Sequence, residues 1–331
     1  MSVFAFAIGV ATRDGQGNCI DCFFPAPLKE PQGDLGDAVI AAFKPGTTPL
    51  QAEQVRDFVL AHQPALAPML ESGRELIATL LPADQAISST PEAFLKLHLL
   101  SHRLALPNSM NLDGIFAHLQ TVAWTTEGAI ALADLPGRQL QARLDGRHFE
   151  VLSVDKFPKM ANYVVPSGVR IADSSRIRLG AYLGEGTTVM PSGAVNFNAA
   201  ALGPNMVEGR ISQGVILGQG SDLGGAASTM GTLAGGGEIT ITIGKQCLIG
   251  ANGGTGIPLG DRCTIEAGLY ITAGTRVTVI DEDGNRMRVV RGRELAGGSD
   301  MLFIRHSESG EVQCRTNRKA IALNEQLHAH N

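Results

Sequence analysis

Aliphatic residues recur at almost every sixth position between Val165 and Val277. The members of this series are Val165, Ile171, Ile177, Leu183, Val189 and Val195, then Ile211, Leu217 and Leu223, then Ile243 and Ile249, and finally Leu259, Ile265, Ile271 and Val277. An α-helix repeats every 3.6 residues and an ordinary strand every two, so neither gives a period of six. A hexapeptide β-helix does, because each face of its three-sided coil takes one hexad. The spacing predicts a left-handed parallel β-helix.

The period of six is broken at three places: between Val195 and Ile211, between Leu223 and Ile243, and between Ile249 and Leu259. Such breaks mean that a loop leaves the coil or that a corner is enlarged. In solenoids these insertions collect on one face, which is often the binding face. We therefore expect functional residues at 196–210 and in the glycine-rich segment 230–238.

The chain divides into three parts around this series. We expect an N-terminal α/β domain over residues 1–160, the β-helix over 161–280 and a small C-terminal β cap over 281–331, so that the fold is mainly β. In the first part, apolar spacing predicts a strand at 4–12, helices at 34–43, 49–62, 68–81 and 91–104, and a hairpin at 140–154. In the last part we expect hairpins at Asp283-Gly284 and Ser309-Gly310, and a short helix at 321–327.

The composition excludes several classes of protein. The net charge is −5, so we expect no nucleic-acid-binding surface. No apolar run approaches the ~18 residues of a membrane-spanning helix. The five cysteines are odd in number and few for a secreted protein, which indicates reduced thiols and a cytoplasmic location.

Glu208 is the strongest candidate for chemistry, because it lies in the first break between Val207 and Gly209. A carboxylate in apolar surroundings can act as a general base near neutral pH, although a solvated loop glutamate fits the sequence as well. Arg210 can clamp a substrate carboxylate, or it can pair with Glu208. A backbone N–H near Gly231 can act as the oxyanion donor for a thioester carbonyl.

Histidine is absent from residues 165–278, although the chain contains eight. Many hexapeptide acetyltransferases use a histidine base on the coil, and metal-binding coil enzymes use histidine ligands. A histidine mechanism or a histidine metal site is therefore not expected within the coil, unless a neighbouring subunit delivers His306.

Several longer motifs are far more specific than the hexad. They are Val195-Asn-Phe-Asn198, Met206-Val-Glu-Gly-Arg-Ile-Ser212, Gly220-Ser-Asp-Leu-Gly-Gly225, Met230-Gly-Thr-Leu233 with Gly235-Gly-Gly237, and Ile265-Glu-Ala-Gly-Leu-Tyr-Ile-Thr-Ala-Gly-Thr-Arg276. Together they resemble the tetrahydrodipicolinate N-succinyltransferases of the longer, second type. The resemblance implies a homotrimer whose active sites lie between neighbouring coils.

The resemblance also implies a reaction and its residues. A succinyl group passes from succinyl-CoA to the amino nitrogen of ring-opened tetrahydrodipicolinate, which gives N-succinyl-2-amino-6-oxopimelate on the diaminopimelate and lysine route. The resemblance implies that Glu208 is the catalytic carboxylate and that the Gly231 amide is the oxyanion donor. Contacts to succinyl-CoA are implied at Arg210, Gly225, Ser228, Ala251, Glu266, Ala267, Gly274, Arg291, Ile304, Arg305, His306 and Ser307.

Two roles are open to Glu208. It can take a proton from the amine as the amine attacks the thioester, or it can attack first and form an acyl anhydride that the amine then opens. We favour the base, because a ternary complex needs no reactive intermediate beside water. Some relatives bind magnesium on the trimer axis through acidic residues near Ser175 and Ser192, and because this chain has serines there we expect no metal site and no permanently bound cofactor.

Two alternatives remain open from the sequence. The chain can be a hexapeptide acyltransferase for another amine, such as an amino sugar. It can also be a non-catalytic trimeric β-helix that serves as a binding module.

Overall fold

The structure is a computed structural model, which describes residues 2–231 and 240–316. The chain forms two compact units. Among the described residues, one unit comprises 2–105 together with Ser109–Val164, and the other comprises Leu106–Asn108, 165–231 and 240–316. The three-part division at residues 160 and 280 stays a prediction, and the helix predicted at 321–327 lies outside the described residues. No helix in the described ranges is long and apolar enough to cross a lipid bilayer.

The first unit is built on an antiparallel sheet in the order β2-β1-β5-β4, with β3 also paired to β1. Its strands are β1 (Ala5–Arg13), β2 (Cys19–Phe23), β3 (Leu28–Lys29), β4 (Gly46–Leu50) and β5 (Leu76–Leu81). Phe6, Ile8 and Leu80 share a hydrophobic core with residues of three helices, which are α1 (Gly33–Ala42), α2 (Ala52–His62) and the 3₁₀ helix η1 (Pro64–Glu71). The strand predicted at 4–12 and the helix predicted at 34–43 are confirmed.

Two further groups of elements complete this unit. Helix α3 (Thr90–Ser101) is buried from Pro91 to Ser101, which confirms the helix predicted at 91–104. A second antiparallel sheet has the order β7-β6-β8. The remaining elements are α4 (Ile115–His118), β6 (Val122–Thr125), β7 (Gly128–Ala131), α5 (Leu135–Leu144), β8 (Val151–Asp155) and the 3₁₀ helix η2 (Met160–Asn162).

Two predicted elements of this unit are wrong. Residues 76–81 form β5 and not the end of a helix, because six consecutive apolar residues, all buried, carry no period that separates strand from helix. Helix α5 replaces the first arm of the hairpin predicted at 140–154, because Gly146, with φ of 66°, follows the end of a helix and does not close a two-residue turn. The helix predicted at 49–62 begins only at Ala52, after β4 has ended.

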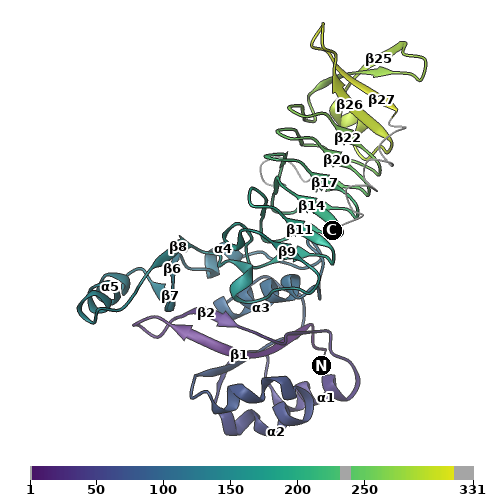
Figure 1. The fold of residues 1–331 in the computed structure, drawn as a ribbon. Coiled ribbons are helices and arrows are strands. Elements are labelled where there is room, and N and C mark those ends of the chain that lie inside the picture. The colour runs from purple at the N-terminus through teal and green to yellow at the C-terminus, as the bar shows by residue number, and fades with distance from the viewer. Residues whose placement is uncertain (1, 232–239, 317–331) are drawn as a thin grey trace. The chain divides into compact units, whose positions relative to one another are not determined.

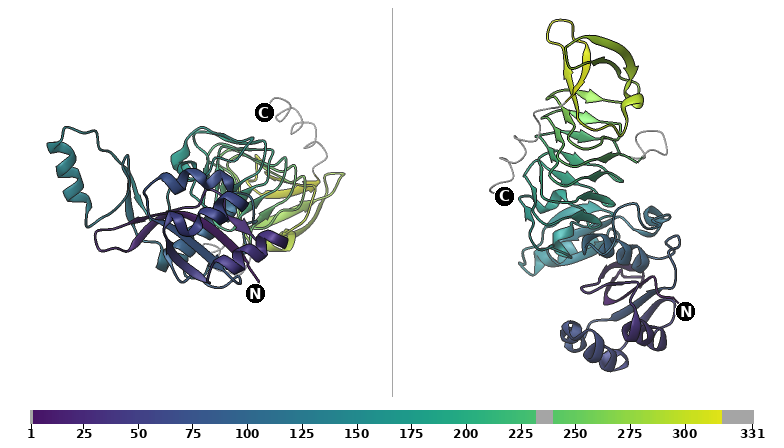
Figure 2. Two further views of the ribbon diagram at one scale, coloured as in Figure 1. Left: turned by 90° about the horizontal axis from the view of Figure 1, so that it is seen from below. Right: turned by 90° about the vertical axis from the view of Figure 1, so that its right-hand side faces the viewer.

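The second unit is a coil with three faces, and each face is a parallel sheet (Figure 1 and Figure 2). The β9 face contains β9 (Arg170–Ile171), β11 (Thr187–Val189), β14 (Asn205–Val207), β17 (Asp222–Leu223), β20 (Leu248–Ile249) and β22 (Thr264–Ile265). The β12 face contains β12 (Ala194–Val195), β15 (Arg210–Ile211), β18 (Ser228–Thr229), β21 (Gly254–Thr255) and β23 (Tyr270–Ile271). The β10 face contains β10 (Ala181–Leu183), β13 (Ala199–Ala201), β16 (Ile216–Leu217) and β19 (Thr242–Ile243).

The aliphatic series forms the interior of this coil. On the β9 face, strand pairing places Ile171, Val189, Val207, Leu223, Ile249 and Ile265 in one column. From Val189 onward these side chains are buried. Each column therefore excludes water along the coil, and the predicted left-handed parallel β-helix is confirmed as the fold.

The breaks in the period are shorter than the gaps between successive aliphatic residues of the series indicate. Ala201 and Val207 continue the series after Val195, so the first break is confined to Glu208 and Gly209. Thr229 and Thr255, both buried, continue the series further along. The second break thus follows Thr229, and the third lies between Thr255 and Leu259. The expectation that a break extends over 196–210 is wrong, because alanine and threonine also fill interior positions.

Four longer strands follow the last hexads. Strand β26 (Met301–Arg305) extends the β9 face by pairing with β22, and β27 (Val312–Thr316), β24 (Arg276–Ile280) and β25 (Arg286–Arg291) continue the sheet beyond it. The hairpins predicted at Asp283-Gly284 and Ser309-Gly310 are confirmed as β24–β25 and β26–β27.

Candidate active site

Glu208 lies in a shortened corner of the coil, between β14 and β15. Its backbone N–H donates to the carbonyl of Leu223 over 2.9 Å, and its carbonyl accepts a hydrogen bond from the Ser192 hydroxyl over 2.9 Å. Ser192 belongs to the preceding coil and Leu223 to the following one. The backbone of Glu208 is therefore fixed from both sides, which limits the positions that its side chain can take.

Gly209 allows this corner to be short. A Cβ added at Gly209 would lie 2.3 Å from the carbonyl oxygen of Ala227 in the next coil. Atoms that are not bonded do not approach so closely, so any other residue would displace one of the two coils. The sequence Glu208-Gly209 thus places an acidic side chain at a corner that only glycine can close.

The side chain of Glu208 is half-buried and faces the next coil. Its Oε2 lies 3.6 Å from the point where a Cβ on Gly225 would be. Gly225 belongs to the corner between β17 and β18, one coil further along. Because glycine has no side chain, a carboxylate beside it remains accessible to a small molecule and can accept a proton from an amine.

Equivalent corners of successive coils form a column beside Glu208. The register of the β9 face places Gly225, Ala251, the pair Glu266 and Ala267, and then the segment 304–307 at the corners that follow. We name this column, from Glu208 to Ser307, the Glu208 edge. Its four steps of about 4.8 Å between neighbouring strands make it roughly 19 Å long. Most of the residues expected to contact succinyl-CoA are therefore brought together on one edge.

Hydrogen bonds connect the corners of the Glu208 edge to one another. The Asn252 N–H donates to the carbonyl of Gly225 over 2.8 Å, and the Gly268 N–H donates to that of Ala251 over 2.8 Å. The Arg305 N–H donates to Oε2 of Glu266 over 2.7 Å. Ala251 and Ala267 are exposed. A rigid edge with small exposed side chains leaves room for a narrow, extended ligand.

Arg210 and Ser228 are brought together on the β12 face. Nε of Arg210 donates to Oγ of Ser228 over 3.0 Å. The ion pair between Arg210 and Glu208 that the sequence left open is not among those formed by the described residues. The guanidinium group of Arg210 is thus directed by a hydroxyl group and not by a carboxylate.

Three predicted residues lie away from the Glu208 edge. Gly231 follows β18, so it lies at the opposite border of the β12 face, where an added Cβ would be 3.2 Å from Cβ of Ser212. Gly274 lies in the turn after β23, and Arg291 ends β25 beside that turn, since the Gly292 N–H donates to the carbonyl of Thr275 over 2.8 Å. The fold of this chain therefore does not bring Gly231 to Glu208.

The sequence prediction missed the connection of Arg176 to this site. Nη2 of Arg176 donates to the carbonyl of Ser192 over 3.0 Å, and the hydroxyl of Ser192 donates to the carbonyl of Glu208. Ser192 lies in the corner that precedes Glu208 by one coil. Ser192 precedes Glu208 by 16 residues, which is the length of one shortened coil. This spacing is the signal in the sequence that could have identified the connection.

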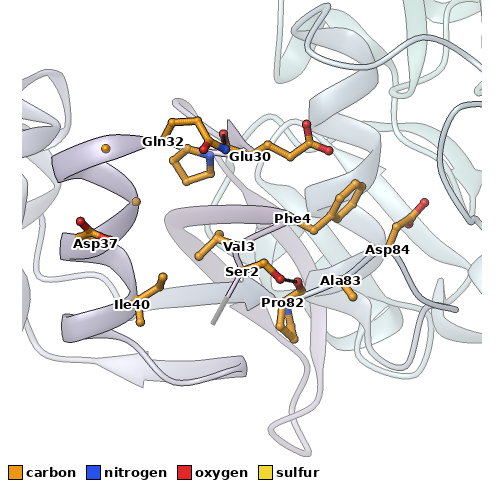
Figure 3. Close-up of a pocket in the computed structure, with 13 residues that line it drawn as sticks. Ser2, Val3, Phe4, Glu30, Gln32, Asp37, Ile40, Pro82, Ala83 and Asp84 are labelled. Atoms are coloured by element: carbon orange, nitrogen blue, oxygen red, sulfur yellow. Dashed lines mark hydrogen bonds between the residues drawn. The ribbon is translucent and has the colours of Figure 1, made fainter.

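A pocket of about 440 Å³ lies in the first unit, where residues 2–4 before β1, residues 82–84 after β5 and the side of α1 meet (Figure 3). Its lining includes Glu30, Asp37 and Asp84, of which Asp84 pairs with Lys96 over 2.7 Å, and the Ser2 hydroxyl donates to the carbonyl of Pro82 over 3.0 Å. None of the predicted site residues lines it. Exposed carboxylates make this pocket a poor site for anionic substrates. No set of three metal-ligating side chains comes together among residues 2–231 and 240–316.

Comparisons with known proteins agree with the fold and the motifs. Residues 119–159 match the family model described as tetrahydrodipicolinate N-succinyltransferase middle, and residues 240–273 match the one described as hexapeptide repeat of succinyl-transferase. A relative from Pseudomonas paraeruginosa is 55% identical, over 100% of this chain and 99% of its own length. A relative from Vibrio cholerae is 49% identical, over 100% of both chains. Both are named 2,3,4,5-tetrahydropyridine-2,6-dicarboxylate N-succinyltransferase.

A solved structure has the same fold. It comes from Campylobacter jejuni and is described as a 2,3,4,5-tetrahydropyridine-2-carboxylate N-succinyltransferase. It is 32% identical and covers 96% of this chain and 93% of its own, with a TM-score of 0.88. With relatives about half identical over its full length, this chain belongs to the 2,3,4,5-tetrahydropyridine-2,6-dicarboxylate N-succinyltransferase family of acyltransferases.

Proposed function

We propose that this chain transfers a succinyl group from succinyl-CoA to the amino group of ring-opened tetrahydrodipicolinate. The products are N-succinyl-2-amino-6-oxopimelate and CoA, in the diaminopimelate and lysine route. The reaction follows from the family to which the chain belongs. The location of the active site is supported by one observation, the half-buried Glu208 carboxylate beside Gly225 at the start of the Glu208 edge.

In this proposal Glu208 is the general base. The amine nitrogen attacks the thioester carbonyl, and Glu208 takes the proton that the nitrogen loses as the new N–C bond forms. The C–S bond then breaks, and the departing sulfur of CoA takes the proton that Glu208 now carries, so that CoA leaves as the thiol and Glu208 returns to the carboxylate. The Gly231 amide N–H donates to the oxygen of the tetrahedral intermediate, an interaction that typically lowers the activation barrier by about 3–4 kcal/mol.

Succinyl-CoA occupies the Glu208 edge, with its thioester next to Glu208. We propose contacts from Gly225, Ala251, Glu266, Ala267, Ile304, Arg305, His306 and Ser307 on this edge. Further contacts come from Arg210 and Ser228 on the β12 face and from Gly274 and Arg291 beside the last coil. The exposed and small residues of the edge support this placement, since an extended chain can lie along them.

We propose a homotrimer with the active sites between neighbouring coils. In one protomer, Glu208 and Gly231 lie at opposite borders of the β12 face. A second coil packed against this one can supply Gly231 of the partner subunit to Glu208. We further propose a cytoplasmic enzyme with no permanently bound cofactor or metal, and the described cysteines are free thiols, as such a location favours.

A thiol-release assay with a panel of acceptors tests the function. We expect rapid CoA release from succinyl-CoA with tetrahydrodipicolinate, and none above background with amino sugars. Faster release with an amino sugar would favour the other acyltransferase class. Absence of release with every acceptor would favour a non-catalytic binding module.

Pre-steady-state kinetics separate the two roles of Glu208. A general base predicts no thiol release when succinyl-CoA is mixed with enzyme in the absence of acceptor. A burst of CoA equal to the enzyme concentration, with a succinylated enzyme trapped at the same time, would support the anhydride instead.

A further inference from the structure

Two cysteines of the first unit lie side by side in strand β2. Cys19 begins the strand, and Cys22 follows it in the sequence Cys19-Ile-Asp-Cys22. Their sulfur atoms are 3.3 Å apart, which is within the range of a thiol hydrogen bond. We name these two side chains the β2 dithiol. The succinyl transfer proposed above makes no use of them.

A β-bulge brings the two thiols together. Along a regular strand successive side chains alternate between the two faces, so residues three apart point in opposite directions. Where β1 has the adjacent residues Thr12 and Arg13, β2 has three, 19–21, and Ile20 is the extra one. One extra residue reverses the alternation, so that Cys19 and Cys22 share a face. The contact between the two sulfur atoms therefore depends on the bulge.

Asp21, which lies between the two cysteines, holds the bulge in place. Its carboxylate accepts a hydrogen bond from the hydroxyl of Tyr163 over 2.6 Å and another from the hydroxyl of Thr12 over 3.4 Å. The thiols are thus adjacent before any reaction takes place. A bond between them then costs little conformational entropy, because the segment is already ordered.

The two thiols differ in access and in acidity. Cys19 is half-buried, whereas Cys22 is completely buried. The hydrogen bond from the Cys22 thiol lowers the pKa of Cys19, and the positive charge of Arg13 acts in the same direction. Burial raises the pKa of Cys22 well above its usual range. Since the thiolate is the form that attacks, Cys19 is the nucleophile and Cys22 reacts second.

The other three cysteines are less accessible. Cys247 and Cys263 are completely buried inside the coil, and Cys314 in β27 is 5% exposed. Oxidation of a thiol requires access to the oxidant as well as thiolate character. Of the five cysteines, Cys19 is the one that combines partial exposure with an adjacent second thiol.

We propose that the β2 dithiol is a redox modification site, which a small-molecule disulfide converts to a Cys19–Cys22 disulfide. The Cys19 thiolate attacks one sulfur of the small disulfide, whose S–S bond breaks as the new S–S bond forms. The released thiolate takes the proton of Cys22, and the Cys22 sulfur then displaces the second small thiolate from Cys19. That thiolate regains from water the proton that Cys19 lost.

The overall exchange is balanced and reversible. Two electrons pass from the cysteines to the small disulfide, which gives one protein disulfide and two small thiols. An excess of the small thiol drives the reaction backwards. In a reducing compartment such a disulfide is therefore transient, as is usual for redox-sensing pairs.

The test is to incubate the wild-type enzyme with glutathione disulfide and then to titrate thiols in denaturant. We expect the number of free thiols to fall from five to three, with no glutathione retained on the protein. Peptide mapping should show Cys19 joined to Cys22, and excess reduced glutathione should restore all five thiols. A wild-type enzyme that keeps five thiols, or that loses two elsewhere, would overturn the proposal.

Three variants test the order of the two steps. Cys22→Ser removes the second thiol, so the reaction should stop with one glutathione retained on Cys19. Cys19→Ser should retain none and keep its four thiols. Cys314→Ala is the matched control and should lose two thiols as the wild type does. Glutathione on Cys22 in Cys19→Ser, or none on Cys19 in Cys22→Ser, would overturn the proposed order. None of these readouts depends on succinyl transfer, so this proposal and the proposed function fail separately.

Discussion

The position of Glu208 depends on the residue that follows it. Gly209 lies against the carbonyl of Ala227 in the next coil. Because the two coils can approach so closely there, this corner holds two residues fewer than a regular hexad. The shortened corner directs the Glu208 side chain toward Gly225 of the next coil. From the sequence, the apolar neighbours of Glu208 indicated that this residue acts as a base. Its contact with Gly225, in contrast, depends on how successive coils pair.

Gly209→Ala tests this dependence. The added methyl group would overlap the Ala227 carbonyl at 2.3 Å, and we expect a loss of about 1–3 kcal/mol in the free energy of unfolding. We also expect kcat to fall by roughly a hundredfold, because a displacement near 1 Å at a catalytic group costs about that much. Denaturant unfolding and the thiol-release assay measure the two effects.

Gly137→Ala provides the matched control for this change. Gly137 lies in α5, and a Cβ there meets nothing within 4 Å. Alanine should stabilise this helix by about 0.5–1 kcal/mol without affecting turnover. If Gly209→Ala behaves like Gly137→Ala, the close approach at the Glu208 corner is not what positions the site.

His98 in α3 is held in its neutral form. The ring is fully buried; its Nε2 accepts from the Phe24 N–H over 3.2 Å, and its Nδ1 lies 2.7 Å from the Phe94 carbonyl, to which it donates. Burial lowers the pKa of His98 to about 3. One nitrogen must therefore remain without a proton in the folded chain, whereas the unfolded chain binds a proton below about pH 6.5.

This difference in proton binding predicts that stability falls in acid. The free energy of unfolding should be level above about pH 7 and should decrease by roughly 1.4 kcal/mol per pH unit below about pH 6.5, until the folded ring titrates near pH 3. Denaturant unfolding of the wild type and of His98→Gln between pH 8 and pH 4.5 measures the slopes. The variant should be less stable at pH 8 but should have a flatter slope. Equal slopes would show that His98 does not cause the effect.

One tight corner of the coil is closed by a threonine of the interior, Thr255. The hydroxyl of Thr255 donates to the carbonyl of Ile257 over 2.7 Å and accepts from its N–H over 3.2 Å. Both residues are buried, so these backbone groups have no access to water. Threonine at this interior position therefore sets the shortened spacing between Thr255 and Leu259.

Thr255→Val keeps the shape of the side chain and removes the hydroxyl group. We expect a loss of about 1–3 kcal/mol in the free energy of unfolding, because two buried backbone groups lose their partner. Thr242→Val, at the exposed position of β19, is the control and should change stability by less than about 0.5 kcal/mol. A Thr255 variant as stable as the Thr242 variant would show that the hydroxyl does not hold the corner.

The elements that the sequence predicts well are those with a clear period. The hexads predict the coil, and the spacing at 34–43 and 91–104 predicts α1 and α3. The strand β5 was missed because a fully buried apolar run has no period, and α5 was missed because a glycine after aspartate ends a helix as readily as it closes a hairpin. In both cases the local sequence fits two kinds of element, and only tertiary packing decides between them.

The site that we propose draws on residues from more than one face of the coil. Motifs such as Met206-Val-Glu-Gly-Arg identify the family from the sequence. The column of the Glu208 edge explains how Glu208 and Ser307, 99 positions apart in the chain, can contact one ligand. The separation of Gly231 from Glu208 in one protomer is the reason for proposing that a neighbouring coil completes the site.

We propose that the Glu208 carboxylate performs the acid–base chemistry of succinyl transfer. Its most direct test is the kcat of Glu208→Gln with succinyl-CoA and tetrahydrodipicolinate, beside Glu185→Gln, which removes the same charge from an exposed corner of the coil. We predict that Glu208→Gln lowers kcat by roughly 10²–10⁴-fold while CoA binding and the folded state persist, and that Glu185→Gln retains normal turnover. A Glu208→Gln enzyme with wild-type turnover would contradict the account.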